Sequence, residues 1–419
     1  MKIAIIGSGI SGLSTAWLLN KNGHDISVFE QNSYIGGHSN TVQIEGHPPI
    51  DTGFIVFNNQ TYPNLIALFD LLGVESTQTD MSFGVSLDQG RLEYSSHAMF
   101  GQKKNLVNPK FYKMLSDILQ FYKHAPDIIE ADTDLSLGAY LEQNRYSTYF
   151  IDNHILPMGA AIWSMSKEDM FDYPVQTFVR FFVNHGLLQV KNRPKWRSVH
   201  GGSREYVSKL TADFKDKIML NCKIDTIKRN NDHIVINNQK FNHVILATHS
   251  DQALSLLSDP STEETDVLSN IPYSTNTAYL HTDERLMPKN KKCWSSWNYL
   301  SSQNGQVELS YWMNTLQQHI ENNKNYFVTL NPLIPPRDET ILYQTTYHHP
   351  VYVASSVKAQ KRIKRLQGYK NTWYCGAWCG YGFHEDGLTS GLYVAEKLAN
   401  IKRPWGNVEE KSVSAVNTI

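Results

Sequence analysis

The feature that most constrains the fold is a glycine cluster directly after a short apolar run at the start of the chain. The run is KIAII (residues 2–6), and the cluster is GSGISG, in which Gly7, Gly9 and Gly12 form a G-x-G-x-x-G pattern. Such a run is typical of a strand that is buried on both faces of a parallel sheet. Glycines placed there let the backbone approach a phosphate at a helix N-terminus, but the pattern alone is weak evidence.

The segments after the cluster supply the context that the pattern requires. Residues 13–22 (LSTAWLLNKN) have a helical pattern that Gly23 ends, and residues 26–29 (ISVF) indicate a second strand. Glu30 ends this strand, at the position where an acidic side chain accepts hydrogen bonds from ribose hydroxyls. The order of these elements predicts a Rossmann-like βαβ unit that binds a dinucleotide. The candidate contacts are Gly7, Gly9, Ser11, Gly12, Glu30 and Gln31.

Further glycines follow Glu30, and ordinary NAD-binding domains do not need them. A second glycine pair opens GGHSNT (residues 36–41), and Gly53 stands within IDTGFIVF (residues 50–57). The pattern E-x5-GG-H-x-x-T followed by D-x-G resembles the FAD-binding half of flavin amine oxidases, phytoene desaturases and protoporphyrinogen oxidases. An arginine that contacts phosphate usually follows the glycine pair in that superfamily, and this chain has His38 instead. The resemblance implies FAD contacts from Gly36, Gly37, His38, Gly53, Phe54 and Ile55.

The sharpest signature is WYCGAWCGYGFHEDGLTSG (residues 373–391), near the other end of the chain. A strand leads into glycines and then into a helix that we expect to begin near Asp386. In the resembled superfamily the N-terminus of this helix points at the flavin, where its free N–H groups suit the anionic reduced ring. The resemblance implies FAD contacts from Gly376, Glu385, Asp386, Gly387 and Leu388. It also implies contacts from two further predicted strands, residues 218–224 and 244–248, through Ile224, Ala247 and Thr248.

The resemblance extends over nearly the whole chain. The stretches DTGFIVFN, SYWMN, TYHHPV and GYGFHEDGL resemble one bacterial subfamily of predicted FAD-dependent oxidoreductases. Its members are often encoded beside cyclopropane-fatty-acid-synthase-like methyltransferases, which implies a fatty-acyl or lipid context and fixes no substrate. The expected fold is α/β, with a Rossmann-like FAD-binding domain of the amine-oxidase type and an interleaved α+β substrate-binding domain. We expect residues 1–74, 199–270 and 351–403 in the first domain, 75–198 and 271–350 in the second, and 404–419 as a flexible tail.

Composition restricts the class of protein. The 419 residues carry a formal net charge of −1, which argues against a general attraction to nucleic acid. Four scattered cysteines do not suit a disulfide framework and favour a reducing cytosol. Cys375 and Cys379 lack a second ligand pair at zinc spacing, so no metal is expected. Without a basic leader or an apolar run of membrane-spanning length, the sequence predicts a cytoplasmic protein.

Two stretches of the substrate half combine basic and apolar residues. Residues 111–123 (FYKMLSDILQFYK) follow Lys103, Lys104 and Lys110, and residues 180–188 (RFFVNHGLL) precede Lys191, Arg193, Lys195 and Arg197. Such stretches suit peripheral contact with the inner membrane surface. Helices that face the core and leave their lysines in water are the commoner explanation of the same pattern.

The candidates for catalysis are histidines and one tyrosine. A flavin accepts the hydride itself, so the protein supplies orientation and proton transfer, and histidine titrates near neutral pH. The catalytic candidates are His384, His348, His349 and Tyr311, with Trp312 and Tyr381 as possible walls of the pocket.

The main functional hypothesis is an FAD-dependent oxidoreductase or desaturase that removes a hydride from a long apolar chain, of fatty-acyl or lipid type. A flavin amine oxidase for small amines and a redox-neutral, FAD-dependent double-bond isomerase are the alternatives, followed by a non-enzymatic FAD-binding scaffold. The sequence leaves the electron acceptor and the oligomeric state open.

Overall fold

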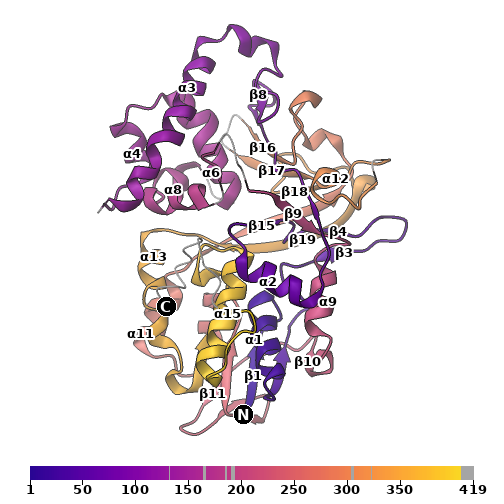
Figure 1. Cartoon of the computed structure of the whole chain (residues 1–419), viewed down its shortest axis with the longest axis vertical. Coiled ribbons are helices and arrows are strands. Elements are labelled where there is room, and N and C mark those ends of the chain that lie inside the picture. The colour runs from indigo at the N-terminus through magenta and orange to yellow at the C-terminus, as the bar shows by residue number, and fades with distance from the viewer. Residues whose placement is uncertain are drawn as a thin grey trace.

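The computed structural model describes residues 1–131, 133–163, 167–184, 186–189, 194–302, 306–321 and 323–406. Its elements form two regions, one above the other in Figure 1. A parallel sheet with flanking helices lies in the lower region, which also holds the marked N-terminus, and a larger sheet with a group of helices lies in the upper region. Lys191 and Arg193 of the second basic stretch, and residues 407–419 of the expected tail, lie outside the described residues.

The lower sheet is built from short apolar strands that are buried on both faces. Its five parallel strands have the order β10-β2-β1-β14-β20. Ile3, Ala4 and Ile5 of the central strand are fully buried, as the opening apolar run predicts. The predicted βαβ unit is thus confirmed. The elements are β1 (Lys2–Ile6), α1 (Ile10–Lys21), β2 (Asp25–Phe29), β10 (Ile218–Met219), β14 (His243–Leu246) and β20 (Thr372–Tyr374).

Helices α1 and α15 (His384–Ala399) pack together on one face of this sheet. Leu392 and Ala395 of α15 are fully buried in this packing. The other face packs against a second core that contains Ile224, Ile227 and Val267. That side carries α10 (Ser250–Leu256), α11 (Thr262–Ser269), α13 (Ala354–Gln360), α14 (Ile363–Leu366) and the sheet of β11 (Lys228–Arg229), β12 (Ile234–Ile236) and β13 (Gln239–Phe241).

Two turns near this second core involve asparagines with positive φ. Asn237 and Asn238 have φ values of 48° and 61° and form a two-residue turn between β12 and β13. The strand predicted over residues 218–224 was too long. Only Ile218–Met219 pairs with β2, because the chain turns at Asn221, which has a φ of 52°, and then crosses the end of β2.

The upper sheet has seven strands in the order β19-β15-β18-β17-β16-β7-β8. They are β7 (Phe83–Leu87), β8 (Leu92–Ser95), β15 (Tyr273–His281), β16 (Trp297–Ser301), β17 (Val307–Trp312), β18 (Phe327–Leu330) and β19 (Ile341–Pro350). Two separate segments of the chain therefore build one sheet. The domain boundaries given above stay a prediction.

Shorter elements complete the described chain. The small sheets contain β3 (Thr41–Val42) with β4 (Ile50–Asp51), and β5 (Phe57–Asn58) with β9 (Trp196–Val199) and β6 (Ser76–Gln78). The upper helices are α3 (Pro109–His124), α4 (Leu137–Gln143), α5 (Thr148–Phe150), α6 (Leu156–Trp163), α7 (Lys167–Phe171), α8 (Val175–Asn184) and α12 (Met313–Leu316). Helix α2 (Pro63–Leu72) lies between β5 and β6 in the chain, and α9 (Arg204–Thr211) packs against it.

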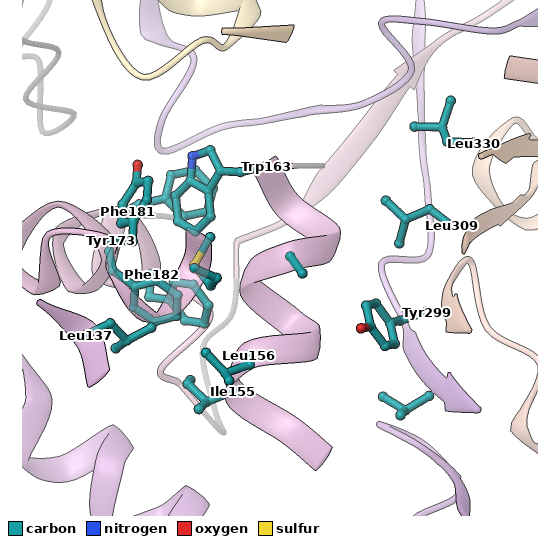
Figure 2. Close-up of a cluster of buried hydrophobic side chains, with 14 of the residues drawn as sticks. Leu137, Ile155, Leu156, Trp163, Tyr173, Phe181, Phe182, Tyr299, Leu309 and Leu330 are labelled. Atoms are coloured by element: carbon teal, nitrogen blue, oxygen red, sulfur yellow. The ribbon is translucent and has the colours of Figure 1, made fainter. Parts of the chain in front are cut away.

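The largest core joins the upper helices to one face of the seven-stranded sheet. Figure 2 shows Trp163, Tyr173, Phe181 and Phe182 gathered on one side of a helix, while Tyr299, Leu309 and Leu330 project from strands on its other side. Phe181 and Phe182 are 3% and 0% exposed, so the second basic stretch packs these two aromatic side chains inward. These two side chains therefore agree with the explanation in which the helix faces the core.

Candidate active site

A single cavity of about 1790 Å³ extends from the glycine-rich turns of the lower region to the aromatic wall of the upper region. Ordinary ligand pockets measure roughly 300–1,000 Å³. The cavity is therefore large enough for a cofactor and a substrate together. Its lining includes Gly9 and Glu30 at one end, and Tyr94 of strand β8 and His154 of the helical region.

The three glycine motifs of the N-terminal segment meet at the lower end of the cavity. Gly9 and Gly36 form an isolated β-bridge, and a Cβ atom on Gly37 would lie 3.1 Å from Cα of Gly9. A Cβ atom on Gly53 would lie 2.2 Å from the carbonyl oxygen of His38, so only glycine fits there. The motifs that the sequence separates by tens of residues thus form one surface.

Gly9 and Gly12 have different surroundings. A Cβ atom on Gly12 would lie 2.0 Å from the carbonyl oxygen of Gly7, so this glycine is required for the packing of α1 on the preceding turn. A Cβ atom on Gly9 would meet nothing within 4 Å, and Gly9 lines the cavity. The turn therefore leaves open space at the helix N-terminus, where phosphate groups bind in proteins. This geometry fits a dinucleotide.

Glu30 is held at the same end by the glycine turn itself. Its Oε2 atom accepts hydrogen bonds from the backbone N–H and the hydroxyl of Ser8, at 2.9 and 2.7 Å, and its Oε1 atom accepts one from the N–H of Asn32 at 2.8 Å. Glu30 is 5% exposed and lines the cavity. A carboxylate has about four acceptor positions, so one remains for a ribose hydroxyl.

Most of the cofactor contacts expected from the sequence line this cavity. They are Gly7, Gly9, Ser11, Glu30, Gln31, Gly36, Gly37, His38, Gly53, Phe54, Ile55, Ile224, Ala247, Thr248 and Gly376. No bound group tests these contacts, and they stay predictions. Gly12, Glu385, Asp386, Gly387 and Leu388 are outside the lining.

The start of α15 explains why its acidic residues lie outside the lining. The carboxylate of Glu385 accepts hydrogen bonds from the backbone N–H groups of Asn64 and Leu65 and thereby caps helix α2. Asp386 accepts hydrogen bonds from the N–H groups of Tyr381 and Phe383 and caps α15 itself. The two side chains therefore hold the backbone of the site in place and make no contact with the cavity.

His384 begins α15 and lines the cavity. Its ring stacks on Phe54 with a centroid distance of 3.8 Å, and its Nε2 atom lies 2.8 Å from the hydroxyl of Tyr206, which lies 2.5 Å from the hydroxyl of Ser39. Burial lowers the pKa of His384 to about 3. The imidazole is thus neutral at physiological pH, and it has a fixed place in a chain of hydrogen bonds.

Three more histidines form a group with His38 in the cavity wall. The ring of His38 lies 5.5 Å from that of His349, and the ring of His249 lies 6.0 Å from that of His348. Burial, followed by the charges of neighbouring histidines, lowers the pKa of His38 to about 4 and that of His249 to about 4. Nε2 of His38 is buried without a hydrogen-bond partner among the described residues.

His349 has a defined tautomer. The side-chain oxygen of Asn276 accepts from the amide of Asn331, so its nitrogen donates to Nδ1 of His349 at 2.9 Å. Burial, with the charges of His38 and His348, lowers the pKa of His349 to about 3. The neutral ring therefore carries its proton on Nε2.

The wall of the upper region is one face of the seven-stranded sheet. Phe83, Trp297 and Tyr311 are direct partners across three neighbouring strands, so their side chains share a face. Tyr94, Leu330 and Tyr347 line the cavity from β8, β18 and β19. Because β8 and β19 are the two edges of the sheet, the lining extends over six strand spacings of about 4.8 Å, or about 29 Å.

Among the predicted wall residues, Tyr311 and Tyr381 line the cavity, whereas Trp312 does not. Trp312 follows Tyr311 directly and therefore points to the other face of the strand, where it packs against Trp294 with a centroid distance of 5.4 Å. Burial raises the pKa of Tyr311, so its hydroxyl stays protonated.

A further buried histidine, His154, lies next to Tyr94 of strand β8 in the lining. The hydroxyl of Tyr94 donates to the carbonyl oxygen of Asn153 at 2.6 Å, and it lies 3.1 Å from Nδ1 of His154. Since the hydroxyl proton is used, Nδ1 of His154 must be the donor in this pair. Burial lowers the pKa of His154 to about 4, so its Nε2 atom is an unprotonated acceptor, without a partner in the described part of the chain.

Sequence reasoning missed His249, Tyr94 and His154, which carry no motif. The one available signal for the first was its position directly after the strand that ends at Thr248. Among described residues, no three His, Cys, Asp or Glu side chains are placed to share a metal ion, and burial raises the pKa of Cys375 to about 12. No helix in the described ranges is long and apolar enough to cross a bilayer.

Comparisons with known proteins match this site to one family. The model of the flavin-containing amine oxidoreductase family matches residues 10–326. A putative flavin-containing monoamine oxidase, AofH, of Mycobacterium tuberculosis is 26% identical over 242 residues, which cover 54% of this chain and 51% of that protein. The chain thus spans about half the length of this curated relative.

Solved structures match over nearly the whole chain. A putative protoporphyrinogen oxidase from Exiguobacterium sp. 255-15 has a TM-score of 0.70 at 15% identity, with 95% of this chain and 98% of that chain covered. A CLA-producing fatty acid isomerase from P. acnes has a TM-score of 0.68 at 15% identity, with the same coverage of 95% and 98%. At this identity the likeness shows a common fold, which confirms the expected α/β class.

Proposed function

The chain belongs to the family of flavin-containing amine oxidoreductases, whose cofactor is FAD, and from this membership we propose that it is an FAD-dependent oxidoreductase acting on a long apolar substrate. The substrate class that we propose is a fatty-acyl or other lipid chain, from which a hydride is removed. The observation that carries this proposal is the shape of the cavity, which continues from the glycine turns along the face of the seven-stranded sheet.

The lower end of the cavity suits FAD in several respects. Gly9 leaves room at the N-terminus of α1 for the pyrophosphate, and Glu30 has an acceptor position for the ribose. His38, whose Nε2 has no hydrogen-bond partner in the described ranges, stands where the resembled superfamily has a phosphate-binding arginine. When bound, FAD would supply the hydride-accepting ring.

The protein's own groups orient the substrate and exclude water. The ring of Phe181 stacks on Phe383, directly before α15, with a centroid distance of 4.8 Å, so aromatic side chains surround the cavity next to the helix N-terminus. The lining histidines with lowered pKa values carry no positive charge there, because burial keeps them neutral. Neutral imidazoles and an apolar wall favour an uncharged chain over an ammonium ion. Among the described residues of the lining, the only carboxylates for such an ion are those of Glu30, Asp80 and Asp225.

The decisive experiment is anaerobic mixing of the FAD-loaded protein with a panel of substrates. We expect unsaturated or methylated fatty acyl lipids to bleach the flavin absorbance and small primary amines to leave it unchanged. Bleaching by the amines alone would replace the proposal by an amine oxidase activity.

The same cavity also suits the isomerase alternative, because a structural relative with this fold is a fatty acid isomerase. Product analysis of the anaerobic mixture separates the two reactions. Hydride removal gives at most one product molecule for each flavin without an added acceptor, whereas a redox-neutral isomerase gives many. Multiple anaerobic turnovers would therefore contradict the oxidoreductase proposal.

A further inference from the structure

Exposed apolar side chains are concentrated in one segment of the upper region. Five of the eleven exposed large hydrophobic side chains in the described residues lie within residues 100–119. They are Phe100, Leu106, Val107, Tyr112 and Leu119, with exposed fractions of 39, 51, 83, 48 and 60%. Exposure on this scale in one short segment is typical of an interaction surface.

These side chains lie on neighbouring elements. The ring of Phe100 is 5.8 Å from that of Tyr112, and the hydroxyl of Tyr112 donates to the carbonyl oxygen of Leu106 at 2.9 Å. Leu106 and Val107 end a short 3₁₀ helix (Lys103–Val107) that leads into α3. We call the surface formed by Phe100, Leu106, Val107, Tyr112 and Leu119 the α3 patch.

Helix α3 has two distinct faces. Its inner face buries Phe111, Met114, Ile118 and Phe121 in the main core. Tyr112 and Leu119 are seven residues apart, which is two helical turns, and so lie on one outer face. The outer apolar positions are thus not needed for the packing of α3 onto the protein.

The α3 patch is surrounded by lysines. Residues 100–123 contain Lys103, Lys104, Lys110, Lys113 and Lys123, and their one acidic residue is Asp117. Asp117 is fully buried, accepts hydrogen bonds from Ser147 and forms an ion pair with Lys113 at 2.6 Å, so it offsets the charge of Lys113. Lys103, Lys104, Lys110 and Lys123 remain as the excess positive charge of the segment. The chain as a whole is nearly neutral, with 39 basic and 40 acidic residues, so this local excess of positive charge is specific to the segment.

The cavity reaches the same segment from the inside. Met99 precedes the patch in the sequence and Tyr122 lies on α3, and both line the cavity. In Figure 1 α3 lies in the upper region, away from the parallel sheet.

We propose that the α3 patch docks onto an anionic lipid bilayer, with its apolar side chains in the interface and its lysines among the head groups. Apolar insertion and lysine attraction together are the two contributions that hold a peripheral protein on such a surface. The cavity wall at Met99 and Tyr122 then lies next to the membrane. Docking requires neither bound FAD nor turnover, so it can be tested apart from the proposed reaction.

The test is co-sedimentation of the full-length protein with vesicles, in the absence of substrate. We expect binding to vesicles of phosphatidylcholine mixed with phosphatidylglycerol, little binding to phosphatidylcholine alone, and weaker binding as salt is raised. The Lys103→Gln, Lys104→Gln double variant should bind roughly 30-fold more weakly, about fivefold for each lysine. Val107→Glu with Leu119→Glu should abolish binding.

Matched controls keep the test specific. Ile334 is 45% exposed and lies outside the segment, so Ile334→Glu should bind vesicles as the wild type does. FAD content and thermal unfolding should be unchanged in all variants, since every altered side chain is at the surface. Failure of the wild type to bind anionic vesicles would overturn the proposal, as would equal loss of binding in Ile334→Glu. A change of oligomeric mass in the Val107→Glu, Leu119→Glu variant without vesicles would assign the patch to a second copy of the chain instead.

Discussion

Gly9 and Gly12 are three residues apart, yet an added methyl group has opposite consequences at the two positions. Gly9 has a φ of −69° and open space around its Cβ position, so alanine fits there without strain. Gly9→Ala should stabilise the apoprotein by about 0.4–1 kcal/mol, because alanine lowers the conformational entropy of the unfolded chain. The same methyl group occupies the space expected for the pyrophosphate, and the affinity for FAD should fall at least tenfold. Gly12→Ala should destabilise the fold by about 1–3 kcal/mol, because its Cβ would overlap the oxygen of Gly7.

Urea unfolding of the apoprotein and FAD titration by fluorescence distinguish the two effects. Normal FAD affinity in Gly9→Ala would show that the pyrophosphate does not lie against this turn.

The lowered pKa of His38 predicts that the affinity for FAD depends on pH. In the free protein its pKa is lowered to about 4 by burial and by the charges of His249 and His348. A bound pyrophosphate favours the protonated imidazole and raises this pKa, so FAD binding takes up a proton in the pH range between about 4 and the raised value. Affinity should therefore increase as the pH falls from 7.5 towards 5.5.

Two variants at this position provide the comparison. His38→Gln should flatten the pH profile of FAD affinity except for the part contributed by His249 and His349. His38→Arg should bind FAD more tightly at pH 7.5, with less dependence on pH. An unchanged profile in His38→Gln would exclude His38 from the phosphate site.

At the scale of elements, a side chain of α15 caps a helix that is more than 300 residues away in the sequence. Helix α2 has no side-chain cap from its own N-cap residue, Tyr62, and Glu385 supplies it through the N–H groups of Asn64 and Leu65. Glu385→Ala leaves these buried donors unpaired and should lower the free energy of unfolding by about 2–4 kcal/mol. Glu385→Gln keeps one acceptor oxygen and should cost less.

The pH dependence of this effect has a defined sign. Burial raises the pKa of Glu385 to about 7, above its unfolded value of 4.5, so the folded state binds more protons between these pH values. The contribution of Glu385 to stability is then greatest below pH 4.5 and decreases as the pH rises towards 7. The cost of Glu385→Gln in urea unfolding should accordingly be smaller at pH 7.5 than at pH 5. Loss of FAD without loss of stability in Glu385→Ala would favour a direct cofactor contact instead.

Elements with local signals could be predicted from the sequence, and those defined by distant contacts could not. The first strand, α1 and the hairpin at Asn237 carry their apolar runs and turn residues within a few positions. The predicted start of α15 near Asp386 is two residues late, because its N-terminal cap uses Phe383 and begins the helix at His384. The cofactor role inferred for Glu385 depended on a motif, whereas its bond partners belong to α2.

The candidate site also has one part with a local sequence signal and one part without such a signal. Glycines locate the nucleotide end, because few other residues tolerate such close backbone contacts. The substrate wall is assembled from single side chains on separate strands, such as Tyr94, Phe83 and Trp297. Aromatic residues in strands are common in any core, so no local pattern distinguishes those that face a cavity.

At the scale of the whole molecule, the length of the cavity favours a long acyl chain over a small amine as the substrate. Ile162 lies on α6, lines the cavity and is partly buried, so a larger side chain there narrows the part next to the helices. Ile162→Trp should slow anaerobic flavin bleaching by long acyl chains at least tenfold. Bleaching by any short substrate and the content of FAD should remain as in the wild type, because the glycine turns are untouched. Ile334→Trp, on the surface, is the matched control. Equal rates for long chains in Ile162→Trp and the wild type would mean that the substrate does not extend along the sheet, and the cavity beyond the flavin end would then have another use.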